Sequence, residues 1–479
     1  MHTLQRNPFR FIPLLLSLLW TPVEAGEFDG FWRTQGYGAV VHVSGDNAVI
    51  YQETGASFFP VEEVQLQGNR VNLGLPPNEE IYELHFEGDT LVAVHRTSTL
   101  YLDRIESLPP VRGTSPDPMN VFDVYWTTIY ENFPSFPLLD LDWQQVRQEF
   151  QPRVTASMSP AALFDVLGDM GSLLQDGHTT LYAPEFNWFR NMGPAPSPLG
   201  GHLADDVIAN VESNFVDGGR FSEIPLDDRF LYGTINNGAV GYIAILDYEY
   251  RVVPFDQSLD AVLASMGNTQ ALIIDLRDND GGDNWNAMAL TDRLTDRERH
   301  VLTRVVRTGG PDEFGAPTEY VTRPQGTRYT DRPVYLLTND GTASAGEVQS
   351  LMLSALPGVT QVGEPTFGMF SQFTRGLPNG WIMNTSNERF LSLGGNNYEY
   401  QGIRPEIAVE NTIAALNAGE DLILEAALHD FSQRIPVQDS RVPVTAAMSG
   451  SWFAPDHDGE GFLLEILDDE RALVYWFTY

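Results

Sequence analysis

Between about residue 238 and residue 356, short apolar runs alternate with helical patterns, and this alternation constrains the possible folds most strongly. Strands are expected at residues 240–245, 271–275 and 334–337. Helices are expected at residues 255–266, 285–294 and 344–356. The strand runs are apolar almost throughout, so both faces of their sheet need cover. The pattern therefore predicts an α/β core with a buried sheet.

The rest of the chain divides by composition and period. Alternation of apolar and polar residues predicts a β-rich amino-terminal domain over 26–105. A proline-rich linker over 106–118 follows it. Helical periodicity predicts a small helical subdomain over 119–185, and the α/β core then occupies 186–435 with a last helix at 412–429. The stretch 194–230 is rich in Pro, Gly and Asp and receives no assignment.

Both ends of the chain carry further patterns. Residues 1–25 combine two arginines, an apolar run and a small-residue site, which predicts a secretory signal peptide and export to the periplasm or beyond the cell. Residues 446–479 read as a carboxy-terminal β segment. Its Gly450-Ser451-Trp452 echoes Gly30-Phe31-Trp32, which fits either a duplicated unit or two unrelated hairpins. The chain stops on an aromatic strand, a pattern typical of a truncated sequence.

Charge and composition exclude several classes of function. The 65 acidic residues outnumber 28 basic ones, and the net charge of −37 repels nucleic acid and anionic membranes. All 28 basic residues are arginines, so catalysis by a Ser-Lys pair is excluded. The absence of cysteine excludes thiol catalysis and zinc-thiolate sites. No metal-binding motif occurs, and we expect no metal or cofactor.

The turn Thr342-Ala-Ser-Ala-Gly-Glu347 joins the strand at 334–337 to the helix that follows. A serine on such a turn is a common place for a hydrolytic nucleophile, because the next backbone N–H groups and the positive helix end face a developing oxyanion. The sequence therefore predicts Ser344 as a nucleophile. A serine hydroxyl needs a base to attack an amide, which here leaves His, Asp or Glu.

Four histidines are serious candidates for that base: His178, His202, His300 and His429. His178 lies in Asp-Gly-His-Thr-Thr180, a short polar loop that suggests an exposed functional side chain. His429 ends a helix, where an imidazolium also has a structural reason to be.

A second glycine-rich turn, Ile273-Ile-Asp-Leu-Arg-Asp-Asn-Asp-Gly-Gly282, follows the strand at 271–275. Two glycines permit a close backbone approach and offer N–H donors. The positions of the two glycines do not fit the ligand spacing of an EF-hand calcium loop. The alternative, that this turn has only a structural role, remains open.

Five motifs in order resemble the tail-specific (carboxy-terminal-processing) and tricorn-type serine peptidases over about 121–431. They are the Asp-Gly-His-Thr loop, the glycine-rich turn, the serine turn, Val362-Gly-Glu-Pro-Thr-Phe-Gly368 and Glu399-Tyr-Gln-Gly-Ile-Arg-Pro-Glu406. The resemblance implies a crotonase/ClpP-like catalytic core with Ser344 as nucleophile. It also implies an oxyanion hole from Ala345 and from Gly281 or Gly282.

The chain departs from the tail-specific members where they place a catalytic lysine, because Met369 stands at that position. It is closer to the tricorn-type branch, whose pattern implies His178 as general base and Glu399 as the third member. In tricorn a serine directly precedes the histidine, and here that position is Gly177. Glu399 would then contact His178 directly, or Asp176 would assist. No PDZ-like segment is evident between His178 and residue 238.

The sequence thus predicts an exported serine peptidase that acts on peptides or unfolded proteins, with no membrane span once the signal is removed and with an undetermined oligomeric state. Two alternatives remain. An α/β-hydrolase would use His429, although Thr342 stands where that motif has glycine. A binding protein on the same fold, like interphotoreceptor retinoid-binding protein, would need no working catalytic relay.

Overall fold

The computed structural model describes residues 26–73, 81–95, 98–194, 204–310, 313–434, 450–453, 460–466 and 472–478. The signal-peptide prediction for 1–25 lies outside these ranges. Contacts divide the chain into two units, Met1–Ile423 and Leu424–Tyr479. Among the described residues, no helix has the length and apolarity that a membrane crossing requires.

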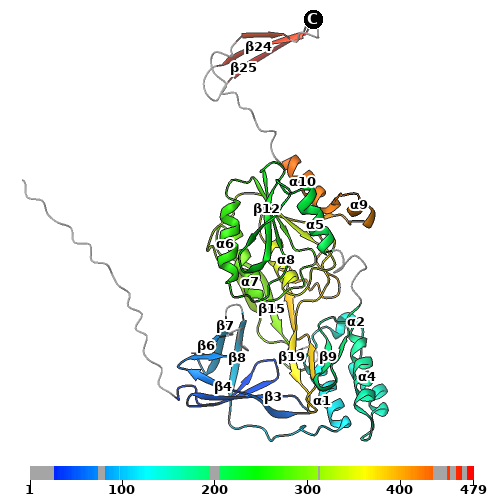
Figure 1. Ribbon diagram of the computed structural model, residues 1–479. Coiled ribbons are helices and arrows are strands. Elements are labelled where there is room, and N and C mark those ends of the chain that lie inside the picture. Colours follow the sequence, from blue (N-terminus) through cyan, green and yellow to red (C-terminus); the bar gives the residue numbers. More distant parts are fainter. Residues whose placement is uncertain are drawn as a thin grey trace, which may run out of the picture. The chain divides into compact units, whose positions relative to one another are not determined.

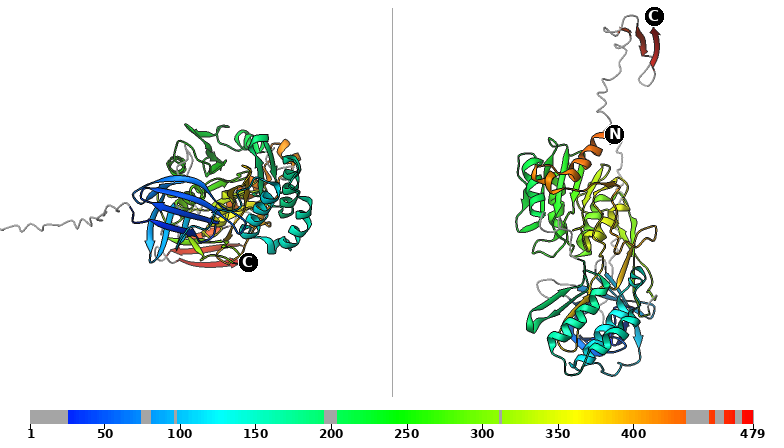
Figure 2. Two further views of the ribbon diagram at one scale, coloured as in Figure 1. Left: turned by 90° about the horizontal axis from the view of Figure 1, so that it is seen from below. Right: turned by 90° about the vertical axis from the view of Figure 1, so that its right-hand side faces the viewer.

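The β-rich amino-terminal part forms a closed eight-stranded barrel (Figures 1 and 2). Each strand pairs antiparallel with the next, and β1 closes the barrel by pairing with β8, with Trp32 opposite Arg104. The inward positions are apolar and buried, Trp32 and Leu102 among them, because side chains alternate between the two faces of a strand. The strands are β1 (Gly30–Thr34), β2 (Ala39–Ser44), β3 (Asn47–Glu53), β4 (Phe58–Gln67), β5 (Arg70–Asn72), β6 (Ile81–Glu87), β7 (Thr90–His95) and β8 (Ser98–Ile105).

The helical segment consists of α1 (Pro118–Asn132), the short α2 (Phe136–Leu139), α3 (Trp143–Phe150) and α4 (Pro160–Gly171). Local chemistry sets the helix starts: Asp117 accepts hydrogen bonds from the N–H groups of residues 119 and 120, and Ser159 caps α4 just before Pro160. The apolar helix faces share a core with β9 (Thr180–Ala183) and β20 (Ile382–Thr385), which pair with each other. β10 (Trp188–Asn191) and β19 (Phe373–Gly376) complete that sheet.

The predicted α/β core is a seven-stranded sheet in the order β11-β12-β13-β14-β17-β18-β22. The strands are β11 (Ser222–Ile224), β12 (Asp227–Ile235), β13 (Val240–Ile245), β14 (Ala271–Asp275), β17 (Val334–Thr338), β18 (Val359–Gly363) and β22 (Ile407–Ala408). All pairs from β13 to β22 are parallel. Every residue of β13, β14 and β17 is buried, so the prediction of a sheet covered on both faces is confirmed.

Helices α6 (Phe255–Ser265), α7 (Asn284–Leu294) and α8 (Ala345–Ser354) share one apolar core with the sheet. Helix α5 (Ala204–Asn214) contributes no described residue to this core. Mixed α/β content and a β-rich amino-terminal region are therefore confirmed. The finer crotonase/ClpP-like assignment stays a prediction.

Two expectations need correction or completion. The helix expected at 412–429 is broken into α9 (Ile413–Asn417) and α10 (Leu422–Arg434), because Gly419 adopts a left-handed φ of +81° between them. The unassigned stretch holds α5, β11 and the start of β12. A further three-stranded sheet, β16 (Thr318–Thr322), β15 (Arg299–Val306) and β21 (Glu388–Leu391), was not foreseen.

The second unit contains an antiparallel sheet of β23 (Gly450–Phe453), β24 (Glu460–Ile466) and β25 (Ala472–Thr478). Trp452 pairs with Phe462 on the second strand, as Trp32 pairs with Val41 in the barrel. Both segments start as antiparallel meanders with a tryptophan in the first strand. The duplication hypothesis stays a prediction.

Candidate active site

Ser344 lies between β17 and α8 in an unusual backbone conformation, with φ 55° and ψ −122°. Few residues other than glycine adopt a positive φ, and such strain persists only where the surroundings hold it. Two hydrogen bonds do so: Ser344 N–H donates to Met369 O at 2.8 Å, and Glu347 N–H donates to Ser344 O at 2.9 Å. The serine is partly exposed while the residues on both sides are buried. The turn therefore presents one hydroxyl to solvent.

Gly281 stands directly against this turn. A Cβ atom at Gly281 would lie 2.5 Å from Ser344 Cβ and 2.8 Å from Ala345 N, so only glycine fits. Its φ of +107° also lies in a region that residues other than glycine rarely adopt. The glycine-rich turn and the serine turn, both singled out from the sequence, are therefore in contact.

The three predicted oxyanion donors differ in availability. The N–H of Gly281 donates to Asn279 Oδ1 at 3.0 Å inside its own loop. Across the described residues, the N–H groups of Gly282 and Ala345 have no hydrogen-bond partner. Gly281 makes room for Ser344, and Gly282 and Ala345 hold N–H groups without a partner in the described ranges. The assignment of the oxyanion donors stays a prediction.

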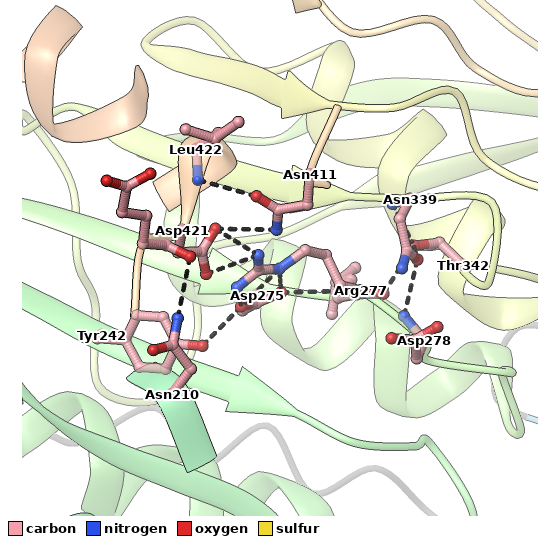
Figure 3. Close-up of polar contacts among 12 residues, drawn as sticks. Asn210, Tyr242, Asp275, Arg277, Asp278, Asn339, Thr342, Asn411, Asp421 and Leu422 are labelled. Atoms are coloured by element: carbon pink, nitrogen blue, oxygen red, sulfur yellow. Dashed lines mark hydrogen bonds and ion pairs between the residues drawn. The ribbon is translucent and has the colours of Figure 1, made fainter. Parts of the chain in front are cut away.

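A buried ion network anchors the loop that carries these glycines (Figure 3). Arg277 is 8% exposed and donates to both oxygens of Asp275 and to both oxygens of Asp421, the latter at 2.9 Å. Asp275 also accepts from Tyr242 Oη at 2.6 Å, and Asp421 accepts from Asn411 Nδ2 at 3.1 Å. One guanidinium thus lies between two carboxylates, and further donors from Tyr242 and Asn411 hydrogen-bond to these carboxylates, as burial requires.

A second set of bonds ties this loop to the serine turn. Asp278 N–H donates to Asn339 Oδ1 at 2.8 Å (Figure 3). Thr342 Oγ1 donates to Leu276 O at 2.7 Å. Both loops follow the carboxyl ends of neighbouring parallel strands, β14 and β17. This edge of an α/β sheet is where sites commonly form.

His178 is 8% exposed, so the expectation of an exposed loop side chain is wrong. The loop turns inward because Asp176, itself buried, accepts hydrogen bonds from His178 N–H at 2.9 Å, Thr179 Oγ1 at 2.9 Å and Ser386 Oγ at 2.8 Å. Burial lowers the pKa of the His178 imidazole, and the charge of Asp176 and the carbonyl of Ser371 oppose that shift. A buried imidazole with a lowered pKa is neutral near pH 7 and can accept a proton.

Met369 connects the histidine loop with the serine turn. Its carbonyl accepts the N–H of Ser344, and its sulfur would lie 2.2 Å from a Cβ atom at Gly177. A side chain at position 177 would therefore require the end of the Met369 side chain to move. Met369 stands where the resemblance puts lysine, so the two positions at which the chain departs from the resembling families are in contact.

Glu347, in the first turn of α8, is a buried carboxyl that the sequence reasoning did not single out. It accepts from Thr366 Oγ1 at 2.5 Å, Gly368 N–H at 2.7 Å and Met369 N–H at 2.5 Å. Burial raises its pKa to about 8, although these donors oppose the shift. Glu347 thus pins the loop that carries Met369. Its position three residues after Ser344, inside an apolar helix, was the available signal.

Glu399 is 2% exposed, and burial together with Asp176 and Glu347 raises the pKa of its carboxyl. Its Oε2 is a buried atom without a hydrogen-bond partner in the described part of the chain, and so is Nδ1 of His178. The neighbouring Tyr400 donates from its N–H to Gly368 O at 2.8 Å and from Oη to Leu174 O at 2.9 Å. The segments around 176, 347, 368 and 399 therefore converge.

The described residues contain no hydrogen bond between Ser344 and His178, or between His178 and Glu399. Catalytic hydrogen bonds are often long without substrate and tighten when it binds. The other histidines have different surroundings. His300 Nε2 contacts Leu302 O and Thr303 Oγ1, His429 is exposed on α10, and His202 lies outside the described residues. Within the described ranges, no group of His, Asp and Glu side chains is arranged to hold a metal ion.

Two parts of the chain match the sequence profiles of known protein families. Residues 239–409 match the profile of peptidase family S41, and residues 116–172 match the tricorn protease C1 domain. The carboxy-terminal processing protease CtpA of Bacillus subtilis is 24% identical over 182 residues, which are 38% of this chain and 37% of that protein. The carboxyl-terminal-processing protease of Synechocystis is 29% identical over 180 residues, which are 36% of this chain and 40% of that one. The chain thus spans well under half of the length of these two relatives.

Solved structures share the fold. The crystal structure of a candidate peptidase from Parabacteroides merdae superposes with a TM-score of 0.59 and 26% identity, over 65% of this chain and 96% of that chain. Mature CPAF in complex with lactacystin gives a TM-score of 0.50 at 14% identity, over 66% of this chain and 97% of that chain, a likeness of fold.

Proposed function

We propose that this chain, which carries a peptidase family S41 domain at residues 239–409 and a tricorn protease C1 domain at residues 116–172, is a serine peptidase. Its substrates would be peptides or unfolded proteins. One observation carries the proposal: the partly exposed Ser344 has a positive φ and touches Gly281, beside the N–H of Ala345, which has no partner among the described residues. Nucleophilic serines of hydrolases need this combination of exposure and nearby donors.

The reaction would be acyl transfer. Neutral His178 removes the proton from Ser344 Oγ as this oxygen attacks the carbonyl carbon of the peptide bond. The N–H groups of Ala345 and Gly282 stabilise the tetrahedral oxyanion. His178 then donates its proton to the leaving amine, and a water molecule hydrolyses the acyl-enzyme through the same base. With no lysine in the chain, a neutral imidazole is the base that fits.

Glu399 is proposed as the residue that orients His178. His178 Nδ1 and Glu399 Oε2, both buried and without a partner among the described residues, are a donor and an acceptor if the imidazole carries its proton on Nδ1. In that tautomer Nε2 carries no proton and is the nitrogen that would accept one from the serine. Asp176 fixes the backbone of the loop through its bond from His178 N–H.

A fluorophosphonate probe tests the nucleophile and the base. The wild type is expected to be labelled, and both Ser344→Ala and His178→Ala are expected to lose the label. His429→Ala is the matched control because it removes an exposed histidine, and labelling should persist. Loss of label in His429→Ala with retention in His178→Ala would point to an α/β-hydrolase mechanism instead.

Digestion of an unfolded protein tests the activity itself. Wild type and Ser344→Ala are incubated with a reduced, unfolded substrate, and the cut sites are mapped by mass spectrometry. Cuts only with the wild type are expected. Equal cutting by both preparations would overturn the assignment, and no label together with no cuts would favour a binding role.

Export is a further part of the proposal. It rests on the charged start, apolar run and small-residue site within residues 1–25. Cell fractionation of the full-length chain, with mass spectrometry of the mature amino terminus, should find cleavage near residue 25. An intact amino terminus in the cytoplasmic fraction would contradict it.

A further inference from the structure

Met369 differs from the other methionines of the chain in its exposure and its position. The chain has 11 methionines and no cysteine, so methionine is its only sulfur-containing residue type. Among the described methionines, Met119 is 44% exposed, and Met158 and Met369 are partly exposed. The others are at most 4% exposed: Met170, Met192, Met266, Met288, Met352 and Met383. Of the three with exposed surface, Met369 is the one that lies in the candidate active site.

The sulfur of Met369 packs against the loop that carries His178. It would lie 2.2 Å from a Cβ atom at Gly177, and the methyl carbon Cε would lie 2.7 Å from that atom. A Cα–Cβ bond is about 1.5 Å long, so the sulfur lies at most about 3.7 Å from Gly177 Cα, which is van der Waals contact. Gly177, Met369 and the neighbouring Phe367 are all partly exposed. Solvent therefore reaches the residues of this contact.

Both partners of this contact are held from the side away from it. The N–H of Met369 donates to Glu347 Oε2 at 2.5 Å, and its carbonyl accepts the N–H of Ser344 at 2.8 Å. Gly193 packs against Gly177, since a Cβ atom at Gly193 would lie 2.4 Å from Gly177 Cα and 2.7 Å from Gly177 N. A change in the size of the Met369 side chain therefore acts on the contact itself.

We propose that Met369 is a modification site, at which a peroxide converts the thioether to a sulfoxide and thereby lowers the activity. A lone pair of the sulfur attacks one oxygen of hydrogen peroxide, and the O–O bond breaks. The second oxygen takes up the proton of the first and leaves as water. The sulfur is oxidised by two electrons and the peroxide is reduced by two. Methionine sulfoxide reductases return the sulfoxide to the thioether, so the modification is reversible.

The sulfoxide does not fit the contact that the thioether makes. Oxidation adds an oxygen atom to the sulfur and makes an apolar group polar. The surroundings of the sulfur include Gly177 Cα and the ring of Phe367, whose nearest carbon would lie 3.8 Å from the same Cβ atom. The modified side chain therefore turns towards solvent or presses on Gly177, and in both cases the His178 loop loses its packing. A displacement of about 1 Å in a catalytic group lowers the rate by up to about 100-fold.

Graded oxidation of the purified protein tests the proposal. Samples are treated with increasing amounts of hydrogen peroxide, the sulfoxide at each methionine is quantified by peptide mapping, and kcat/KM is measured on one peptide. We expect kcat/KM to fall at least about 10-fold as the sulfoxide forms at Met369, and to recover with methionine sulfoxide reductases A and B. Unchanged kcat/KM at complete oxidation of Met369 would overturn the proposal. An unmodified Met369 in a sample whose Met119 is fully oxidised would do so too.

Two variants assign the effect to one sulfur atom. Met369→Leu keeps an apolar side chain of similar size without a sulfur, and each protein is compared with its own untreated sample. At the dose that lowers the wild type about 10-fold, Met369→Leu should keep its own activity within about 2-fold. Met119→Leu is the matched control, because it removes an exposed methionine at the start of α1, and it should lose activity as the wild type does. Equal sensitivity of Met369→Leu and the wild type would contradict the assignment.

Hydrogen exchange supplies a measurement that does not depend on catalysis, whereas the effect on activity rests on the proposed peptidase function. The N–H of His178 donates to Asp176 Oδ1 and the N–H of Thr179 donates to Asp176 O, so both are protected while the loop keeps its conformation. Oxidation should accelerate exchange in the peptide covering residues 176–180 several-fold in the wild type and leave it unchanged in Met369→Leu.

The two measurements separate the two proposals. Faster exchange after oxidation, without Ser344-dependent cleavage by the untreated wild type, would mean that the peptidase proposal fails and the modification site stands. Ser344-dependent cleavage, with exchange and kcat/KM both unchanged after oxidation of Met369, would mean that the peptidase proposal stands and the modification site fails.

Discussion

Single residues decide how the candidate site is built, and Met369 has the widest influence. Its carbonyl holds the strained serine turn through the N–H of Ser344, and its sulfur lies where a side chain at position 177 would begin. The two positions at which the chain departs from the resembling families, 177 and 369, are therefore in contact, and a side chain at 177 requires Met369 to move. The consequence is a site whose only described bases are a buried imidazole and buried carboxyls.

The contact between Gly177 and Met369 predicts a coupled pair of substitutions. Gly177→Ala puts a methyl group about where the sulfur lies and should lower kcat/KM at least about 10-fold, because His178 is displaced. Adding Met369→Ala frees that space, so the double variant should recover much of the loss. Kinetics of the two single variants and the double variant measure this coupling. A double variant as poor as the product of the two single effects would exclude the steric explanation.

The pKa of His178 predicts the acid limb of the pH profile. Burial lowers this pKa below its ordinary 6.5, so the imidazole stays neutral, and active as a base, at pH values where an exposed histidine is already protonated. Activity should therefore be constant from about pH 7 down to pH 6.5 and fall only at lower pH. Measuring kcat/KM of the free enzyme between pH 4.5 and 8 checks this. A half-maximal point above pH 7 would contradict it.

At the scale of elements, the site depends on two loops at the carboxyl edge of the parallel strands. The loop after β14 carries Gly281, and the turn after β17 carries Ser344. Arg277 holds the first loop in the sheet, while Glu347 holds the 366–369 loop against α8. A buried ion network at the first position and a buried, hydrogen-bonded carboxyl at the second make the loop geometry sensitive to the loss of one partner.

Substitution of Arg277 tests the first anchor. Arg277→Met leaves two buried aspartates without their cation and should lower the free energy of unfolding by about 3–5 kcal/mol. Arg323→Met is the control, because the pair of Arg323 with Glu298 is more than half exposed on both sides and should contribute at most about 1 kcal/mol. Urea unfolding of the three proteins gives the comparison. Equal losses of unfolding free energy in the two variants would mean that the Arg277 network does not anchor the loop.

The pKa of Glu347 predicts how stability depends on pH. The folded pKa of about 8 lies above the ordinary 4.5, so the native state binds a proton that the unfolded chain has released. The stability from this group is present below about pH 4.5 and is lost as the pH rises through about 8. The difference is on the order of a few kcal/mol. Glu347→Gln should flatten the slope of unfolding free energy between pH 5 and 8. An unchanged slope would mean that its three donors keep the native carboxyl ionised.

At the scale of the whole molecule, the barrel and the α/β core together form the cleft beside the reactive turn. A direct link between them is Gln52 on β3, whose side chain donates to Gly376 O at 3.0 Å and accepts from Gly376 N–H at 3.2 Å. This pair of bonds fixes the end of β19, the strand that also carries Arg375. The barrel therefore supports β19 in the wall of this cleft and also forms part of that wall.

Loss of that link should affect substrate binding more than chemistry. Gln52→Ala removes both bonds to β19 and leaves the catalytic segments untouched, so KM should rise several-fold while kcat changes less than about 2-fold. Steady-state kinetics on one peptide separate the two parameters. A fall in kcat with constant KM would show that the barrel acts on the reactive turn instead.

Local sequence patterns determined the elements of the core and the identity of the reactive turns. The strands β13, β14 and β17 were predictable because a buried parallel strand needs an unbroken apolar run, which is visible in the residues themselves. The turns were visible because glycine marks backbone conformations that other residues avoid. The break at Gly419 and the sheet of β15, β16 and β21 escaped prediction, since short strands and helix breaks depend on long-range partners.

The tertiary structure alone decided the environment of each side chain. A polar loop containing His178 reads as exposed, and it is buried because Ser386, 210 residues from Asp176 along the chain, supplies one of the donors that Asp176 needs. The same holds for the N–H of Gly281, which donates within its own loop, and for Arg375, which pairs with no acid in the part of the chain that the structure describes. Burial, donor availability and charge balance arise between segments distant in sequence. They set which residues are able to react, and no local pattern encodes them.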